Sequence, residues 1–107
     1  MNTQELISRY KAGQRDFRNL NLIAANLRNL SLVGANFSGT NLSGANLTRT
    51  NLSYANLTGA NLTKAILLDT NFTKANLSDA NLSQVDLSQA KLDQAHLKGA
   101  CLPEVLS

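Results

Sequence analysis

A leucine or phenylalanine occupies every fifth position of this sequence from Phe17 to Leu102. The column has 18 members, 15 Leu and three Phe, without an exception. Two residues before each member the side chain is small or aliphatic, with Ala in 11 places, and only Arg15 departs from this rule. Asn directly precedes the Leu or Phe in 11 of the 18 units. So regular a pattern constrains the backbone more than the composition does.

This period excludes both a straight helix and a straight strand. An α-helix turns by about 100° per residue, so successive members of the column would lie about 140° apart around it. In a strand an odd period sends successive members to opposite faces. The pattern is consistent if Ala45, Asn46 and Leu47 form a short extended piece with Asn46 outward, and the next two residues turn a corner. The Gly, Ser, Thr and Asn residues at the corner positions suit turns.

A chain that turns the same way every five residues winds into a solenoid. Its coils would stack about 4.8 Å apart and pair their backbones as neighbouring strands do. One column of Leu or Phe and one of Ala would fill the interior of each side, because a narrow coil cannot hold two large side chains at adjacent inward sites. The periodicity alone leaves open how many units close one turn.

The units at residues 45–49, 55–59 and 75–79 read Ala-Asn-Leu followed by two variable residues. They resemble the A-(D/N)-L-X-X motif of the pentapeptide repeat proteins, and the resemblance covers residues 15–104. It implies an all-β solenoid, namely a right-handed quadrilateral parallel β-helix with about 20 residues per coil. The 18 units would then make about four and a half coils.

The sequence divides into residues 1–14, 15–104 and 105–107. A short helix is predicted near the start, because Asn2 and Glu5 have the spacing of a capping box and Gly13 suits a helix end. We expect it to be a capping helix over the open end of the first coil, since repeat proteins need such caps. A docking element for a partner is the alternative. The apolar side of this helix would consist of Leu6, Ile7 and Tyr10.

One unit in the regular part carries apolar residues at outward positions. Ile66 and Leu68 should both face solvent, next to the column that contains Arg49. On a coil of 20 residues Arg28 and Arg49 share this side. The arginines either keep an outward surface soluble or attach an acidic partner. We take Ile66, Leu68, Arg28 and Arg49 as the candidate interaction residues.

A second candidate surface lies near the C-terminal end of the repeats. No helix is predicted there, so strand edges and core leucines would be exposed. We expect either a two-fold homodimer or end-to-end pairing with another repeat protein at this edge, and the sequence does not choose between them. The edge consists of Leu87, Leu92, Leu97, Leu102, Val105 and Leu106.

Little in the sequence suggests chemistry. His96 and Cys101 fall in adjacent units, but two ligands alone make a poor metal site. A filled solenoid offers no pocket for a small molecule, so we expect no enzyme, no cofactor, no metal and no small-molecule substrate. No apolar run is long enough to span a membrane and no signal peptide is evident. A cytoplasmic protein is therefore expected, and a targeting segment removed before residue 1 is the alternative.

These features predict a non-catalytic scaffold or protein–protein interaction module. The resemblance implies an alternative, because some pentapeptide repeat proteins mimic DNA and bind or inhibit DNA gyrase, a type II topoisomerase. Such mimicry requires negative charge. This chain has a net charge of +3 and no acidic residue between Asp16 and Asp69, which disfavours the alternative. Direct binding of nucleic acid is also disfavoured, because the basic residues do not line one stripe and Tyr54 is the one aromatic residue expected to be exposed on the coils.

Overall fold

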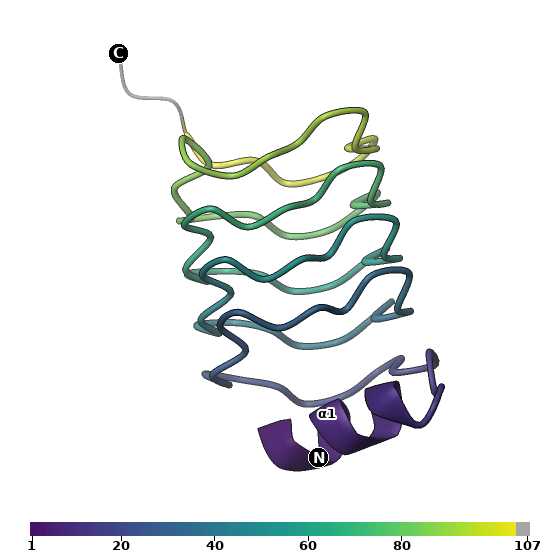
Figure 1. The fold of residues 1–107 in the computed structure, drawn as a ribbon. Helices are drawn as coiled ribbons and strands as arrows, with labels where there is room; N and C mark the ends of the chain where they lie inside the picture. Colours follow the sequence, from purple (N-terminus) through teal and green to yellow (C-terminus); the bar gives the residue numbers. More distant parts are fainter. Residues whose placement is uncertain (105–107) are drawn as a thin grey trace.

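The computed structural model describes residues 1–104, which form one helix beneath a stack of coils (Figure 1). Helix α1 spans Thr3–Lys11. The side chain of Asn2 accepts a hydrogen bond of 2.8 Å from the backbone N–H of Glu5, as the capping pattern predicts. The helix ends at Ala12, and Gly13 follows with φ of 102°, a conformation that glycine adopts without steric cost.

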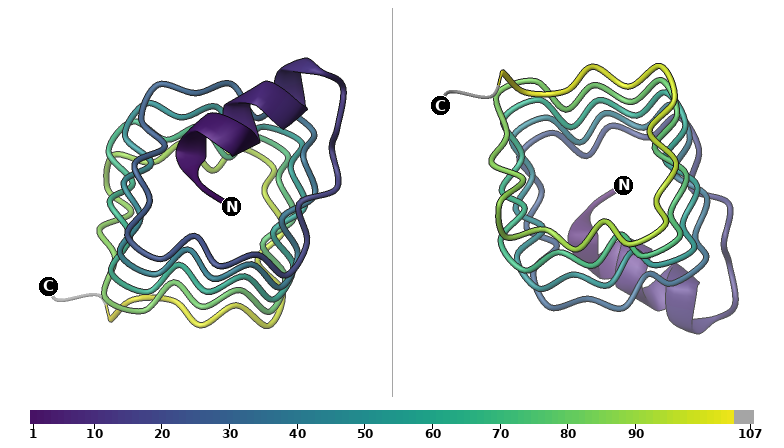
Figure 2. Two further views of the ribbon diagram at one scale, coloured as in Figure 1. Left: turned by 90° about the horizontal axis from the view of Figure 1, so that it is seen from below. Right: turned by 90° about the horizontal axis from the view of Figure 1, so that it is seen from above.

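The coils have a square outline when viewed along their axis (Figure 2). Thirteen parallel β-bridges connect them, and every bridge joins residues 20 positions apart, from Asp16–Asn36 to Asn81–Cys101. Each bridge is a single residue pair. Three hydrogen bonds repeat from coil to coil, such as Leu57 N–H to Asn76 C=O at 2.7 Å, Gly59 N–H to Ser78 C=O at 2.9 Å and Asn76 N–H to Ala55 C=O at 2.9 Å. The stack and its helix form a rod of 44 × 22 × 21 Å.

The corners depend on the last residue of the pentapeptide, which takes a positive φ in every unit from position 19 to position 99 except at Gln89. Eleven residues other than glycine adopt this conformation, among them Arg49 and Tyr54. The central Asn supports the corner, since its Oδ1 accepts a hydrogen bond from the backbone N–H two residues further on. Asn56, for example, accepts bonds of 3.0 Å from Thr58 N–H and 2.7 Å from Thr58 Oγ1–H. Within residues 1–104 no Asn side chain bonds to the Asn of the next coil, so each acts mainly on the corner of its own unit.

The core runs through the middle of the coils. Every member of the Leu and Phe column from Phe17 to Leu82 is buried, with at most 2% of its surface exposed. Three threonines replace alanine in the small column and are also buried, each with its hydroxyl bonded to a carbonyl oxygen of the coil below. The pairs are Thr40 with Phe17 at 2.8 Å, Thr50 with Leu27 at 2.6 Å and Thr70 with Leu47 at 2.7 Å.

Helix α1 lies across the end of the first coil (Figure 2). Leu6 is fully buried, and the Tyr10 hydroxyl donates a hydrogen bond of 2.7 Å to the carbonyl oxygen of Val33. The guanidinium of Arg15 lies 3.7 Å from the centre of the Tyr10 ring, which explains why this unit has no alanine in the small column. No helix of the described residues is both long and apolar enough to cross a membrane.

The core is less covered at the other end. Leu87, Leu92 and Leu97 are partly buried, and Leu102 exposes 51% of its surface. Val105 and Leu106 lie outside the described residues. The pairing edge expected there stays a prediction.

Candidate interaction face

One side of the solenoid contains all four candidate interaction residues. The bridges Asn26–Asn46 and Asn46–Ile66 stack successive coils on this side. Arg28, Arg49 and Leu68 belong to the same units, so the grouping predicted from the 20-residue spacing is present in the structure. We call this side the Ile66 face. It consists of residues 26–29, 46–49, 66–69 and 86–89.

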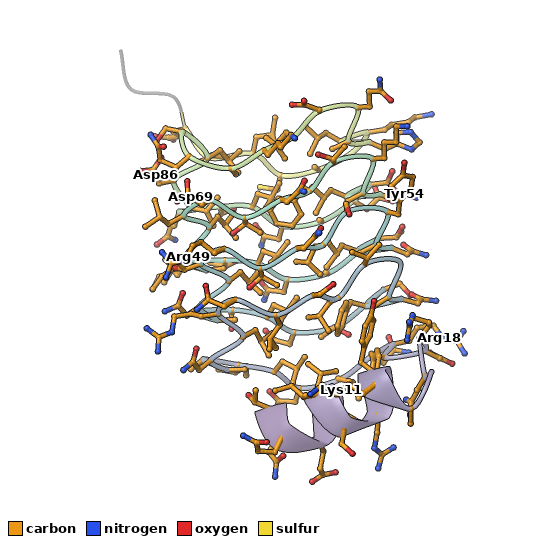
Figure 3. All side chains as sticks on the ribbon, in the orientation of Figure 1. Lys11, Arg18, Arg49, Tyr54, Asp69 and Asp86 are labelled. Carbon is orange, nitrogen blue, oxygen red and sulfur yellow. The ribbon has the colours of Figure 1, made fainter. Side chains whose placement is uncertain are left out.

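The charge on the Ile66 face changes sign along the rod. Arg28 and Arg49 lie in its first two coils, whereas Asp69 and Asp86 lie in the last two. Arg28 Nε donates to Asn26 Oδ1 at 3.1 Å, and Arg49 Nε donates to Asn29 Oδ1 at 2.9 Å. Amide oxygens thus orient both guanidinium groups and leave their positive charge unneutralised. Figure 3 shows Arg49, Asp69 and Asp86 along one edge of the rod, with Tyr54 and Arg18 on the opposite edge.

The ladder of bridges on this face stops between Ile66 and Asp86. Among residues 1–104 these two make no bridge, and neither Leu67 N–H nor Asp86 N–H forms the inter-coil hydrogen bond of its counterparts. The N–H of Asp69 instead donates to the carbonyl oxygen of Gln89 at 2.8 Å. Gln89 is also the one corner residue from position 19 to position 99 without a positive φ. The last turn of this face therefore has a different shape from those below it.

Two departures from the repeat lie beside the break. Ile66 replaces Asn and has no oxygen to accept the N–H of Leu68, so the corner of this unit lacks its usual side-chain bond. Val85 takes the place of Ala in the small column, where a branched side chain needs more room. Asp86 fits the motif and keeps the local bond, since it accepts from Ser88 N–H at 2.9 Å.

Two exposed apolar residues lie beside the break. Ile66 and Leu68 expose 49% and 46% of their surfaces. A pocket of about 210 Å³ lies beside them and is lined by Ala65, Ile66, Leu67, Leu68, Asp86 and Gln89. Pockets for small molecules usually measure about 300–1,000 Å³, so this one is better matched to an aliphatic side chain of a partner protein.

Hydrogen bonding keeps the acidic end of the face charged. Bonds from the Ser88 hydroxyl and then from its backbone N–H lower the pKa of Asp86. On the opposite side of the rod, the Arg18 side chain lowers the pKa of Asp16, with Nε and Oδ1 2.9 Å apart. Both carboxylates are therefore ionised at neutral pH.

The other chemically distinctive residues do not form a site with the Ile66 face. Cys101 Sγ lies 3.1 Å from Ser83 Oγ on a neighbouring side of the last coil. His96 stacks on Asn76 through a bridge on the side opposite the Ile66 face. Within the part of the chain that the structure describes, no three His, Cys, Asp or Glu residues lie close enough together to hold a metal ion.

Sequence reasoning found the exposed pair and the arginines but missed the break in the ladder. The signal was present, because Ile66 and Val85 both depart from the repeat on one side and in consecutive coils. Considered one at a time, these departures do not indicate that they lie together on one side of the solenoid.

Comparison with known proteins agrees with the fold. The family model of pentapeptide repeats matches residues 16–53, 31–67, 40–79 and 70–105. The chain belongs to the pentapeptide repeat family. Members of this family form right-handed β-helices, and the stacked coils described above are this chain's version of that fold. A search of curated proteins found no match.

Several solved pentapeptide repeat proteins are similar to this one. HetL from the cyanobacterium Nostoc sp. strain PCC 7120, involved in heterocyst differentiation regulation, is 34% identical with a TM-score of 0.67 over 94% of this chain. The chain spans only 46% of HetL. Rfr23 from the cyanobacterium Cyanothece 51142 is 27% identical with a TM-score of 0.51, over 94% of this chain and 95% of that one. A pentapeptide repeat protein from the thylakoid lumen of Arabidopsis thaliana is 23% identical with a TM-score of 0.63, over 84% of this chain and 63% of that one.

Proposed function

We propose that this chain is a non-catalytic scaffold that binds a protein partner through its Ile66 face. The observation that carries the proposal is the exposed pair Ile66 and Leu68 at the break in the ladder of bridges. A single exposed aliphatic residue is ordinary on a protein surface. Here two of them coincide with lost backbone pairing, and that combination lowers stability unless a partner covers it.

The filled interior supports an interaction role over catalysis. The columns of Leu, Phe, Ala and Thr occupy the space inside the coils. Catalysis needs convergent polar groups in a cleft that excludes water. On this rod the polar side chains point outward from four flat sides, which suits contact with another macromolecule.

Helix α1 is proposed to cap the first coil rather than to dock a partner. Leu6 is buried against the coil, and the hydroxyls of Thr3 and Tyr10 donate to the carbonyl oxygens of Asn26 and Val33. These are edge carbonyls, which an uncovered coil would leave open to pairing with another chain. The helix thus offers the N-terminal edge the protection that repeat arrays need.

Capture from a lysate of the source organism tests the proposed function. The bait is the intact chain, compared with the double variant Ile66→Asp, Leu68→Asp. A matched control is Tyr54→Asp, Gln94→Asp, which adds the same charge at exposed corner positions on another side. Asp is among the residues that best tolerate the positive φ of these corners.

We expect protein bound to the intact chain and to the control to be lost from the Ile66 and Leu68 variant. Equal capture by all three baits would contradict the proposed face. An assay of gyrase supercoiling with purified protein tests the alternative function, and we expect no inhibition. The long stretch without acidic residues between Asp16 and Asp69 is the physical reason.

A further inference from the structure

We infer that the groove between helix α1 and the first coil binds an extended segment of a partner protein that contains aliphatic and acidic residues. The site goes beyond the proposed function, because it uses the N-terminal edge of the solenoid and neither Ile66 nor Leu68. A pocket of about 310 Å³ occupies the groove, a volume within the range of ligand pockets. It is lined by Ile7, Tyr10 and Lys11 of the helix and by residues 29–32 of the coil.

Ser31 presents an unpaired backbone donor and an unpaired backbone acceptor at this groove. In the coil above, the equivalent residue uses both groups towards the coil beneath it. Asn51 N–H donates to Leu30 C=O at 2.8 Å, and Asn51 C=O accepts from Leu32 N–H at 2.8 Å. Both groups of Ser31 therefore point towards the end of the rod, where no coil lies beneath them. Among residues 1–104 neither group forms a hydrogen bond.

Helix α1 covers the carbonyl groups on either side of Ser31 but leaves Ser31 itself open. Thr3 Oγ1–H donates to Asn26 C=O at 3.2 Å, and Tyr10 O–H donates to Val33 C=O at 2.7 Å. The helix remains a cap, and the binding surface is the part of the edge that this cap does not satisfy. An open strand edge of this kind binds an extended chain by adding it as a further strand.

Strand geometry decides which side chains of the partner enter the groove. A partner residue that runs antiparallel to Ser31 can exchange both hydrogen bonds with it. The side chain of that residue points outward with that of Ser31, whereas the residues on either side of it point inward. There they meet Ile7 of the helix and Leu30 and Leu32 of the coil, so both flanking residues should be aliphatic.

The charge around the groove favours acidic residues in the partner. Lys11 lies where helix α1 meets the first coil, and it belongs to neither of the ion pairs found within residues 1–104 (Figure 3). Residues 1–53 contain six basic and two acidic side chains, and both acidic ones, Glu5 and Asp16, are already paired with arginines. This end of the rod is therefore positive and attracts an acidic segment.

A short synthetic peptide tests the site. The probe is the acetylated and amidated pentapeptide Asp-Val-Thr-Val-Asp, in which the threonine is placed to pair with Ser31 and either aspartate can approach Lys11. Backbone amide signals of the isotope-labelled intact chain are followed by NMR as the peptide is added. We expect saturable shifts of the Ser31 amide, with the Leu57 and Asn76 amides unchanged. No shift of the Ser31 amide at millimolar peptide would overturn the inference.

Methylation of the probe tests the pairing. An N-methyl group on the threonine removes the N–H that donates to Ser31 C=O and should weaken binding about fivefold. The same group on the second valine should leave binding nearly unchanged, because in antiparallel pairing that N–H points away from Ser31. A larger loss from the valine than from the threonine would overturn the proposed pairing.

Charge reversal tests the contribution of Lys11. Lys11→Glu should weaken binding of the acidic probe about fivefold and hardly change binding of a probe with asparagine in place of both aspartates. Lys98→Glu is the matched control, because it makes the same charge change at an exposed position in the last coil. Circular dichroism checks that both variants keep the fold. Equal losses from the two variants would contradict a site in this groove.

Other outcomes separate this inference from the proposed function. Peptide-induced shifts at Leu68 and Asp69 in place of Ser31 would overturn the groove as the site and would favour the Ile66 face. Binding of N-acetylvaline as tightly as the pentapeptide would overturn strand addition and would assign the groove to small acids. Capture from a lysate that depends on Ile66 and Leu68 would support the proposed function whether or not the peptide binds at Ser31.

Discussion

Two opposite sides of the rod are built from the same repeat unit in the same coils, but the ladder of bridges is continuous on one side and interrupted on the other. On the side that begins at Asp16, bridges join Asn36, Asn56 and Asn76 and continue to His96. On the Ile66 face the bridges end at Ile66. Both sides have a buried leucine or phenylalanine at each level from residue 17 to residue 82. Interior packing alone therefore does not hold neighbouring coils in register.

The two sides also differ in the residue at the outward position. Asn36, Asn56 and Asn76 each accept the N–H two residues on, at 3.0 Å, and so fix the corner that places the next backbone for pairing. Ile66 cannot make this bond, and the coil above it follows a different turn. The outward Asn alone does not explain the difference, because Ser31 lacks this bond and still bridges Asn51, whereas Asp86 keeps the bond and makes no bridge among residues 1–104.

The largest changes in the free energy of unfolding should come from replacing core leucines beneath the two sides. Leu57→Ala should lower the free energy of unfolding by about 3–5 kcal/mol, because the cavity would lie among intact coils. Leu67→Ala should cost less, about 2–3 kcal/mol, since the backbone above it lacks bridges and can relax into the space. Urea denaturation followed by circular dichroism measures both. Equal costs would show that the break does not loosen the packing beneath it.

Exchanging the outward residues of the two sides should change the free energy of unfolding by smaller amounts and in opposite directions. Asn56→Ile should lower the free energy of unfolding by about 1–2 kcal/mol, because Thr58 N–H and Oγ1–H lose their acceptor. Ile66→Asn should raise it by about 0.5–1 kcal/mol by giving Leu68 N–H an acceptor. Thermal unfolding at low protein concentration, where association does not contribute, compares them.

Ile66→Asn should also weaken association with the proposed protein partner, because it removes apolar surface from the centre of the face. Stability and association would then move in opposite directions in one variant. If this substitution left the stability unchanged, the side-chain bond at the corner would not be what the Ile66 unit lacks.

The regular parts of this molecule could be predicted from sequence because each depends on a repeated local rule. The inward columns follow from volume and the corners follow from turn chemistry, so the five-residue pattern by itself places Leu57 and Thr40 inside, where both are buried. The change of turn at Gln89 could not be predicted, because Gln is also the corner residue at positions 84 and 94, where φ is positive. The Arg49 bond to Asn29 also joins two coils, and only the three-dimensional structure gives its geometry.

The smallest expected effect is on the titration of one carboxylate from each of the two sides. Hydrogen bonds from Ser88 lower the pKa of Asp86, and the Arg18 side chain lowers the pKa of Asp16. Ser88→Ala should therefore raise the pKa of Asp86 and leave that of Asp16 unchanged, whereas Arg18→Gln should do the reverse. Titration of the side-chain carboxyl carbons by NMR, at a concentration where the chain is monomeric, measures both.

The sign of the pH dependence follows from these shifts. A carboxyl group whose pKa is lower in the folded state binds protons more readily in the unfolded chain, so acid favours unfolding. The contribution of each group is fully present above the ordinary carboxyl pKa of about 4 and is lost as pH falls through the lowered folded-state pKa. Each variant should reduce the loss of stability on acidification. If Ser88→Ala left the Asp86 titration unchanged, the Ser88 hydroxyl would not be what lowers the pKa of Asp86.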